Sequence, residues 1–195
     1  MSAALRQPFA VTTGTLSDED LVAAIRSGNL TGLGTLFDRH GNAVRRLVAR
    51  LGAHARDVDD LVQETFLDCI VAAAKFERGS AVRPWLLGVA MMVMRRHRRS
   101  LGRMFRRLEQ WASQHVERPV PTPADELEWS ESARRGQRAL SLLPAKKRDA
   151  FVLVVVEELS GDEAAAVLGV PIATLWTRVH YARREMLRLL ELDPP

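Results

Sequence analysis

The chain has 195 residues, of which 47% are hydrophobic, and a chain of this length and composition can bury one or two cores. Its single cysteine excludes an internal disulfide and any metal site built from several cysteines. No stretch approaches the roughly 18 apolar residues of a membrane span, and the N-terminus does not resemble a signal peptide, so we expect a cytoplasmic protein without membrane insertion. The formal net charge is only +4, but the charges are unevenly placed.

The N-terminal part of the chain predicts a loose tail followed by two helices. Residues 1–15 show no helical period. Ser17 can then cap a helix whose first turn is acidic, and Gly28 ends that helix. Apolar residues keep helical spacing from Leu30 to Leu51, which predicts a second helix.

A third helix is expected from Asp57 to Phe76, with different chemistry on its two sides. Its buried stripe comprises Val58, Val62, Phe66, Cys69, Ala73 and Phe76. The opposite side gathers four acids with two leucines at their margins, namely Asp57, Asp60, Glu64 and Asp68 with Leu61 and Leu67. Acids on a helix face often serve only solvation, but the two leucines favour a docking surface for a basic partner helix. The residues alone leave both interpretations open.

A fourth helix follows a turn at residues 78–80, and Pro84 is well placed as its first residue. Its apolar side chains fall on two sides, with Trp85, Val89, Met92 and Val93 on one and Leu87, Met91 and Met94 on the other. A plain surface helix would not need both. Residues 80–108 hold eight arginines and no acid, which exceeds what helix capping requires and predicts an electropositive track for phosphates.

The charge reverses after this basic segment. Within residues 117–131, three prolines are followed by four acids, a composition that resists packing and is typical of a flexible linker. We therefore place an acidic linker at residues 109–131, between a first domain at 16–108 and a second at 132–195.

Two helices are expected at the start of the second domain, from Leu127 to Leu143 and from Ala145 to Leu159, split at Pro144. The run from Val152 to Val156 is also typical of a strand. A lone strand among helices has no pairing partner, so we predict a helix there.

The end of the chain predicts a helix-turn-helix. Ser160 and Glu163 have the spacing of a capping box, Gly169 stands where a left-handed residue ends a helix, and Pro171 prevents simple continuation. A second helix then runs from Ile172 to Leu190. Its apolar side comprises Leu175, Val179, Ala182, Met186 and Leu190, and its polar side comprises Thr177, His180, Tyr181, Arg184 and Arg188, with Trp176 and Arg183 at the edge.

The polar side of this last helix suits the major groove of DNA, because its side chains can meet base edges while its arginines contact phosphates. The alternative is an ordinary helical hairpin with a solvated face. One such module with about five phosphate contacts would bind DNA poorly at cellular salt. Since no coiled-coil heptads predict a dimer, something else must hold it on DNA.

No catalytic constellation, metal-ligand spacing or glycine-rich phosphate loop is evident, so we expect neither enzymatic activity nor a cofactor. The one conceivable catalytic cluster is His54 with the acids that follow it, Asp57, Asp59 and Asp60. Those acids fit the start of a helix better, although a nucleic-acid enzyme remains a third hypothesis.

Four segments taken together resemble the extracytoplasmic-function sigma factors of bacterial RNA polymerase, in the sigma-70 superfamily. They are Asp59 to Leu67 (DDLVQETFL), Pro84-Trp85-Leu86 with Val89-Ala90, Leu142-Leu143-Pro144, and Ala173 to Arg183 (ATLWTRVHYAR). The resemblance runs from about Asp20 to Leu190, in the family's order. It implies an all-α fold with a four-helix-type N-terminal domain and a C-terminal helix-turn-helix domain.

The resemblance also implies three sets of site residues. Docking on the clamp helices of the polymerase largest subunit is expected at Asp57, Asp60, Leu61, Gln63, Glu64 and Leu67. Melting and binding of the minus-ten element is expected at Arg78, Arg83, Trp85, Met92, Arg95, Arg96, Arg98 and Arg99. Contacts to the minus-thirty-five duplex are expected at Thr174, Trp176, Thr177, His180, Tyr181 and Arg184.

The implied partners are core RNA polymerase, at its clamp helices and flap, together with promoter DNA and an anti-sigma factor. The protein would associate with the nucleoid when bound to polymerase. The family often has Asn where Met92 stands and basic residues where Trp176 and Tyr181 stand, so base preference does not carry over. The runner-up is a stand-alone helix-turn-helix regulator with a protein-binding N-terminal domain, which has no need of the acidic face from Asp60 to Glu64.

Overall fold

The structure of the protein, a computed structural model, describes residues 16–111 and 131–192. The expected tail at 1–15 and the stretch 112–130, which includes most of the expected linker, lie outside the described residues. The helices are α1 (Asp18–Arg26), α2 (Thr31–Arg50), α3 (Ala55–Ala72), α4 (Val82–Trp111), α5 (Glu131–Leu142), α6 (Ala145–Phe151), α7 (Gly161–Leu168) and α8 (Ile172–Leu192). The described residues contain no strand, which confirms the all-α prediction.

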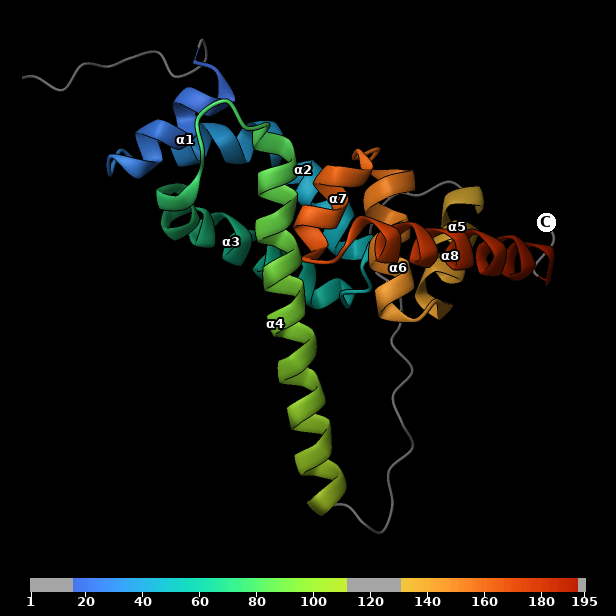
Figure 1. The fold of residues 1–195 in the computed structure, drawn as a ribbon. Helices are drawn as coiled ribbons and strands as arrows, with labels where there is room; N and C mark the ends of the chain where they lie inside the picture. Colours follow the sequence, from blue (N-terminus) through green and yellow to red (C-terminus); the bar gives the residue numbers. More distant parts are fainter. Residues whose placement is uncertain (1–15, 112–130, 193–195) are drawn as a thin grey trace, which may run out of the picture.

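Helices α1 to α4 form the N-terminal domain (Figure 1). Ser17 caps α1 as expected, since its side chain accepts from the backbone N–H of Asp20 at 3.2 Å. Gly32, the second residue of α2, is a poor helix former, but the packing of α2 on α1 requires it. A Cβ at this position would lie 2.8 Å from the backbone oxygen of Leu21, so glycine is what lets α2 pack directly on α1.

Helix α4 is covered on two sides, as its apolar pattern suggested. Leu86, Leu87, Met91 and Met94 are all 1% exposed or less. One side of α4 packs on α2 and α3, and another packs on α7 of the C-terminal domain. The second half of α4 projects beyond the other helices (Figure 1).

The sequence pattern groups Met92 with Val89 and Val93 on one side of α4, but Met92 does not share their burial. Its side chain is 48% exposed, whereas Val89 and Val93 are about as buried as the rest of the core. At about 100° per residue, Met92 falls on the one strip of α4 that neither packed layer covers.

The C-terminal domain contains the predicted helix-turn-helix, formed by α7 and α8. The backbone N–H of Glu163 donates to Ser160 Oγ at 3.3 Å, and that of Ser160 donates to Glu163 Oε2 at 2.9 Å. Gly169 is left-handed with φ 65°, which ends α7. Before this motif, Val152–Val156 continues α6 as a π-helical turn, η3, so the prediction of helix over strand is confirmed.

The two domains are packed against each other, which the expectation of two units joined by a flexible linker did not include. Helix α7 lies along α4, and the side-chain amide of Gln137 in α5 donates to the backbone oxygen of Ala49 in α2 at 2.8 Å (Figure 1). No helix in the described ranges is long and apolar enough to cross a lipid bilayer.

The capping box generates a stability prediction. Ser160→Ala removes the side-chain bond to the N-terminus of α7, and we expect it to lower the free energy of unfolding by about 1 kcal/mol in urea titrations followed by circular dichroism. Ser141→Ala is the matched control, since the Ser141 hydroxyl only donates to a carbonyl within its own helix.

The same bonds predict a pH dependence. Hydrogen bonds from Ser160 lower the pKa of Glu163 below its ordinary value of 4.5. A depressed pKa means that the stabilisation is present above the pKa of the unfolded chain and is lost as pH falls through the folded value. The stability difference between wild type and Ser160→Ala should therefore shrink in acid, and a difference independent of pH would contradict this account of the cap.

Candidate functional site

The outward face of α3 carries acids and apolar side chains together. Asp60, Gln63 and Glu64 are exposed. Leu67 is 61% exposed and Val71 is 77% exposed on the same side. We call these five residues the α3 stripe. Sequence reasoning missed Val71, although it lies four residues after Leu67 and so continues the same helical period.

Two residues expected on this docking face lie elsewhere. Leu61 is only 3% exposed and belongs to the core, because it lies close to Val58 and one turn before buried Thr65 on the helix. The side chain of Asp57 is 27% exposed, and its Oδ2 lies 3.6 Å from Nε2 of His97 in α4. The outward surface is therefore narrower than expected and shifted toward the C-terminal end of α3.

Arg96 joins the acidic surface of α3 to the basic surface of α4. Its guanidinium donates to Glu64 Oε1 at 2.7 Å and to Asp68 Oδ2 at 2.6 Å. These two hydrogen bonds raise the pKa of Arg96. Arg96 thus keeps two acids of α3 partly neutralised while remaining half exposed itself.

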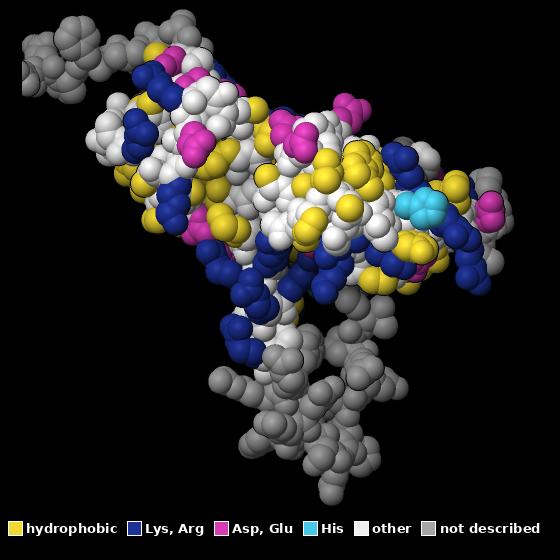
Figure 2. Space-filling view, in the orientation of Figure 1, with side chains coloured by type: hydrophobic (Ala, Val, Ile, Leu, Met, Phe, Trp, Pro, Cys, Tyr) yellow, Lys and Arg dark blue, Asp and Glu magenta, His cyan; other side chains and the backbone are white. Residues whose placement is uncertain are grey.

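An open strip of α4 carries Met92, Arg96, Arg99 and Arg103, all of them exposed. Lys and Arg side chains gather along this projecting part of α4 (Figure 2). The spacing from Met92 to Arg103 keeps one face of the helix. Arg103 was not among the expected site residues, although the helical period from Arg96 and Arg99 leads to it.

Three other arginines of α4 point toward the C-terminal domain instead. Arg83 donates to Glu157 Oε2 at 2.9 Å, and Arg95 donates to the backbone oxygen of Leu168 at 2.9 Å. Arg98 makes two bonds of 2.9 Å to the carboxylate of Asp149. The arginines expected to bind one nucleic-acid strand are therefore divided between two faces of α4.

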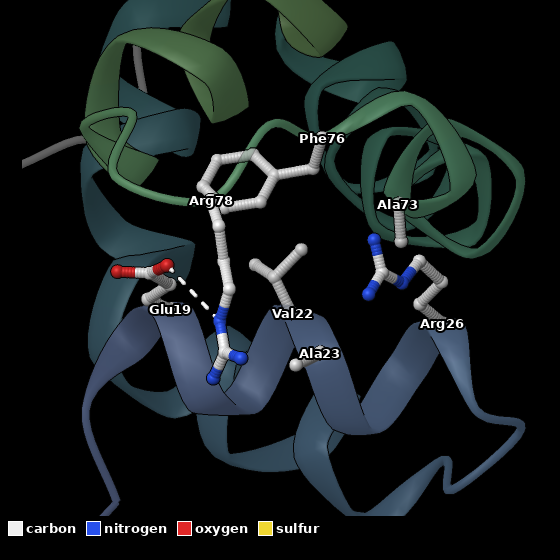
Figure 3. A pocket seen from close by; sticks show the side chains of 7 residues that line it. All are labelled: Glu19, Val22, Ala23, Arg26, Ala73, Phe76 and Arg78. Carbon is white, nitrogen blue, oxygen red and sulfur yellow. Dashed lines mark ion pairs between the residues drawn. The ribbon is translucent and has the colours of Figure 1, made fainter.

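Arg78 and Trp85 lie near the start of α4. Arg78 is 73% exposed and its Nε lies 3.5 Å from Glu19 Oε1, beside a small hollow between α1 and the end of α3 (Figure 3). Trp85 packs edge to face against Phe76, with ring centroids 5.3 Å apart. Trp85 is thereby held at the edge of the core, half-buried.

The outward face of α8 is open, as its pattern predicted. Thr177, His180 and Arg184 are exposed, and Tyr181 is 52% exposed. The opposite side, from Leu175 to Met186, is buried in the domain. Thr174 is only half exposed, so it lies at the margin of this face.

Trp176 is held by a close contact that sequence reasoning missed. A Cβ at Gly161, the first residue of α7, would lie 2.9 Å from Cζ2 of the Trp176 ring. The indole thus packs on the N-terminus of α7 while 46% of the residue stays exposed. Only the absence of a side chain at position 161 allows this placement of the indole. In the sequence, the glycine that directly follows the capping Ser160 is the one feature that could have indicated this contact.

His54, from the one conceivable catalytic cluster, lies at the start of α3. His54 caps α3, because its Nδ1 accepts from the backbone N–H of Arg56 at 3.4 Å. Within the described residues, no group of His, Cys, Asp or Glu is arranged to hold a metal ion.

Cys69 is fully buried, and burial raises the pKa of its thiol to about 12. An exposed thiol has a pKa near 8.5, so at pH 8 the thiolate fraction in the folded chain is lower by roughly a thousandfold. We expect iodoacetamide to alkylate Cys69 at a rate lower by about this factor in the native chain than in urea, as followed by mass spectrometry. Rapid labelling of the native chain would contradict the packing of α3.

Family models match both domains. Sigma-70 region 2 matches residues 36–104, and sigma-70 region 4 matches residues 135–186. The RNA polymerase sigma factor CnrH of Cupriavidus metallidurans is 30% identical over 188 residues, which cover 91% of this chain and 96% of CnrH. The ECF RNA polymerase sigma factor SigC of Mycobacterium tuberculosis is 30% identical over 190 residues, 93% of this chain and 97% of SigC.

Solved structures agree with these matches. CnrH in complex with the cytosolic domain of CnrY has a TM-score of 0.64 at 26% identity and covers 91% of this chain and 99% of that one. The sigma factor RpoE of Bartonella quintana, in complex with the anti-sigma factor NepR, has a TM-score of 0.66 at 25% identity. The match covers 83% of this chain and 98% of RpoE. The chain therefore belongs to the extracytoplasmic-function family of RNA polymerase sigma factors.

Proposed function

We propose that this chain docks on core RNA polymerase through the α3 stripe and directs the polymerase to a restricted set of promoters, with no catalysis of its own. Sigma factors are DNA-binding transcription initiation factors, not enzymes. The observation that carries the proposal is the α3 stripe itself, an exposed run of acids and apolar side chains directly beside the basic strip of α4. A stand-alone regulator has no need of such a surface.

The α3 stripe has the chemistry of a helix-binding surface. Leu67 and Val71 offer apolar area that is otherwise exposed to water, and Asp60 and Glu64 add negative charge beside it. A partner helix with basic and apolar side chains fits both features, and the clamp helices of the polymerase largest subunit are the proposed partner. The flap is the second polymerase contact that we propose, and it would engage the C-terminal domain.

The open strip of α4 suits single-stranded promoter DNA. Arg99 and Arg103 supply charge for phosphates, while Met92 and half-buried Trp85 supply apolar surface for unstacked bases. We therefore assign minus-ten binding first to this strip. Arg83, Arg95 and Arg98 belong to the same element but are occupied by the C-terminal domain in this structure.

The open face of α8 suits duplex DNA at the minus-thirty-five element. Arg184 and His180 can donate to phosphates and base edges, and the exposed rings of Trp176 and Tyr181 can contact thymine methyl groups. We propose that the domain boundary falls in residues 109–131, so that one chain can hold both elements. An anti-sigma factor is a further proposed partner, since the solved structures of CnrH and RpoE are complexes, the latter with an anti-sigma factor by name.

Charge reversal on the α3 stripe tests polymerase docking. Asp60→Lys combined with Glu64→Lys should weaken binding to core polymerase by about a hundredfold or more, because like charges then face the basic partner. The measurement is fluorescence anisotropy of labelled chain titrated with core enzyme. Asp38→Lys, on the exposed side of α2, is the matched control and should bind as wild type does.

Two outcomes of that titration are decisive. Unchanged polymerase affinity in the folded double variant would remove the docking assignment. A wild-type chain that ignores polymerase but retains specific duplex DNA would make the stand-alone regulator the better account.

Arg184→Ala tests the proposed binding of duplex DNA by the open face of α8. Loss of one phosphate or base contact should weaken promoter complexes of the holoenzyme by about tenfold, while polymerase docking stays unchanged. Lys146→Ala, an exposed cation at the start of α6, is the control for charge alone. If Arg184→Ala impaired docking instead, the assignment of separate roles to the two domains would be wrong.

A further inference from the structure

Two aromatic side chains stand at opposite margins of the open face of α8. At about 100° per residue, Trp176 and Tyr181 are separated by about 140° around the helix, with Thr177, His180 and Arg184 between them. Trp176 is 46% exposed and Tyr181 is 52% exposed. A single exposed ring on a protein surface needs no explanation. These two rings differ from that ordinary case because other helices of the domain hold each of them in place.

Tyr181 is held by α6, which packs along α8. The Nζ atom of Lys147 lies over the ring of Tyr181, 6.0 Å from its centroid, where a cation is attracted to the ring face. The same Nζ lies 2.6 Å from Oε2 of Glu185, about one turn after Tyr181 on α8. The ring of His180 meets Tyr181 edge to face, with centroids 5.4 Å apart. Glu185 thus fixes the cation that in turn fixes the phenol ring.

Trp176 is held by α7, at the other margin of the face. A Cβ at Gly161 would lie 2.9 Å from Cζ2 and 3.3 Å from Nε1 of the indole, so the ring lies directly against the backbone of α7. Gly161 is a helical residue, and alanine suits that conformation. Because the indole is the far end of a side chain, a methyl group at position 161 would displace the ring and leave α7 intact.

The part of the face between the rings offers few hydrogen-bond donors. The hydroxyl of Thr177 donates to the backbone oxygen of Ala173 at 2.8 Å, so its proton is used within α8. Only His180 and Arg184 remain as polar groups there. In the major groove, thymine is the base that presents a methyl group, so an apolar side chain placed against it distinguishes thymine from the other three bases. A ring that is fixed before binding also loses less side-chain entropy on contact.

We infer that Trp176 and Tyr181 are the specificity-determining residues of α8, and that each selects a thymine in duplex DNA through its 5-methyl group. This inference rests on the proposed binding of the minus-thirty-five element by α8. The two residues are five positions apart, about 7.5 Å along the helix axis, so they meet different base pairs. Lys147 and Gly161 are positioning residues, because each acts on the DNA through the ring that it holds.

Replacement of single thymines by deoxyuridine tests this inference, because deoxyuridine lacks only the methyl group. The full-length chain with core polymerase first selects its minus-thirty-five sequence from promoter duplexes with randomised bases in that element. Each thymine of the selected element is then replaced in turn, and the affinity of the holoenzyme is measured by competition. We expect two positions at which loss of the methyl group weakens binding by about fourfold, the effect of burying one carbon group. Y181A and W176A then identify which ring contacts which position.

Each positioning residue should act on one of these positions only. K147A should abolish the discrimination between thymine and deoxyuridine at the position of Tyr181, and leave it intact at the position of Trp176. G161A should do the reverse, because its methyl group displaces the indole. K147R keeps a cation over the phenol ring and should restore the discrimination that K147A loses.

Matched controls exist for both positioning variants. K146A removes the neighbouring exposed cation of α6, and G136A adds a methyl group where a Cβ meets nothing within 4 Å. Both controls should keep discrimination at the two positions. Y181F should keep it as well, because the ring and not the hydroxyl makes the contact. Loss of discrimination in Y181F would assign the choice of base to the phenol hydroxyl and overturn the inference.

A phosphate contact by Lys147 gives a different result from a positioning role. It would make K147A weaken binding equally for thymine and deoxyuridine duplexes and lower the log–log salt slope by about one. That result would overturn the assignment of Lys147. A changed thymine preference at an unchanged salt slope is the result that we expect.

The outcomes also separate this inference from the proposed function. If the wild-type chain with core polymerase selects no sequence and fails to initiate, the proposed function is wrong. If the holoenzyme initiates but no thymine of the selected element is sensitive to loss of its methyl group, the selection of thymine is overturned. Sensitivity that persists at both positions in K147A and G161A would overturn the positioning roles.

Discussion

The packing of α4 on two opposite sides is the constraint on which the rest of this structure depends. Leu87 and Met91 belong to the continuous core that α4 shares with both domains. Because apolar side chains occupy both sides, a single uncovered strip is left, and Met92 and Arg99 lie on it. A helix with one buried face would present a wide polar surface. Here the surface that can meet a nucleic acid is narrow and its direction is set by the core.

Electrostatics then divides the arginines of α4 by direction. Arg96 bends toward the acids of α3, Arg98 toward Asp149 of the C-terminal domain, and Arg99 toward solvent. These three residues lie within about one turn of the helix. Their different partners therefore depend on which element packs against each side of α4, and not on their positions along the chain. The exposed ion pairs of Arg96 contribute little to stability, whereas the half-buried pairs of Arg98 specify how the domains sit.

Local features could be predicted from the sequence, and features between distant elements could not. The capping box at Ser160 and the left-handed Gly169 depend on neighbours within four residues, so their patterns are sufficient. The burial of Leu61 and the exposure of Met92 could not be predicted, because helical period tells which residues share a face of the helix but not how wide the covering layer is. No local pattern indicates that Asp149 and Glu157 are buried, since their partners stand 51 and 74 or more residues away in the chain.

One group of arginines is thus under two requirements that oppose each other. In the minus-ten role that we propose for α4, Arg83, Arg95 and Arg98 would have to reach phosphates, and an exposed position would suit them best. For holding the domains, the same side chains must be partly buried against Glu157, Leu168 and Asp149. Ionic contacts reconcile the two, because a guanidinium can exchange a carboxylate for a phosphate without loss of hydrogen bonds. An apolar interface of the same area would offer no such exchange, which is a physical reason for placing charges in this contact.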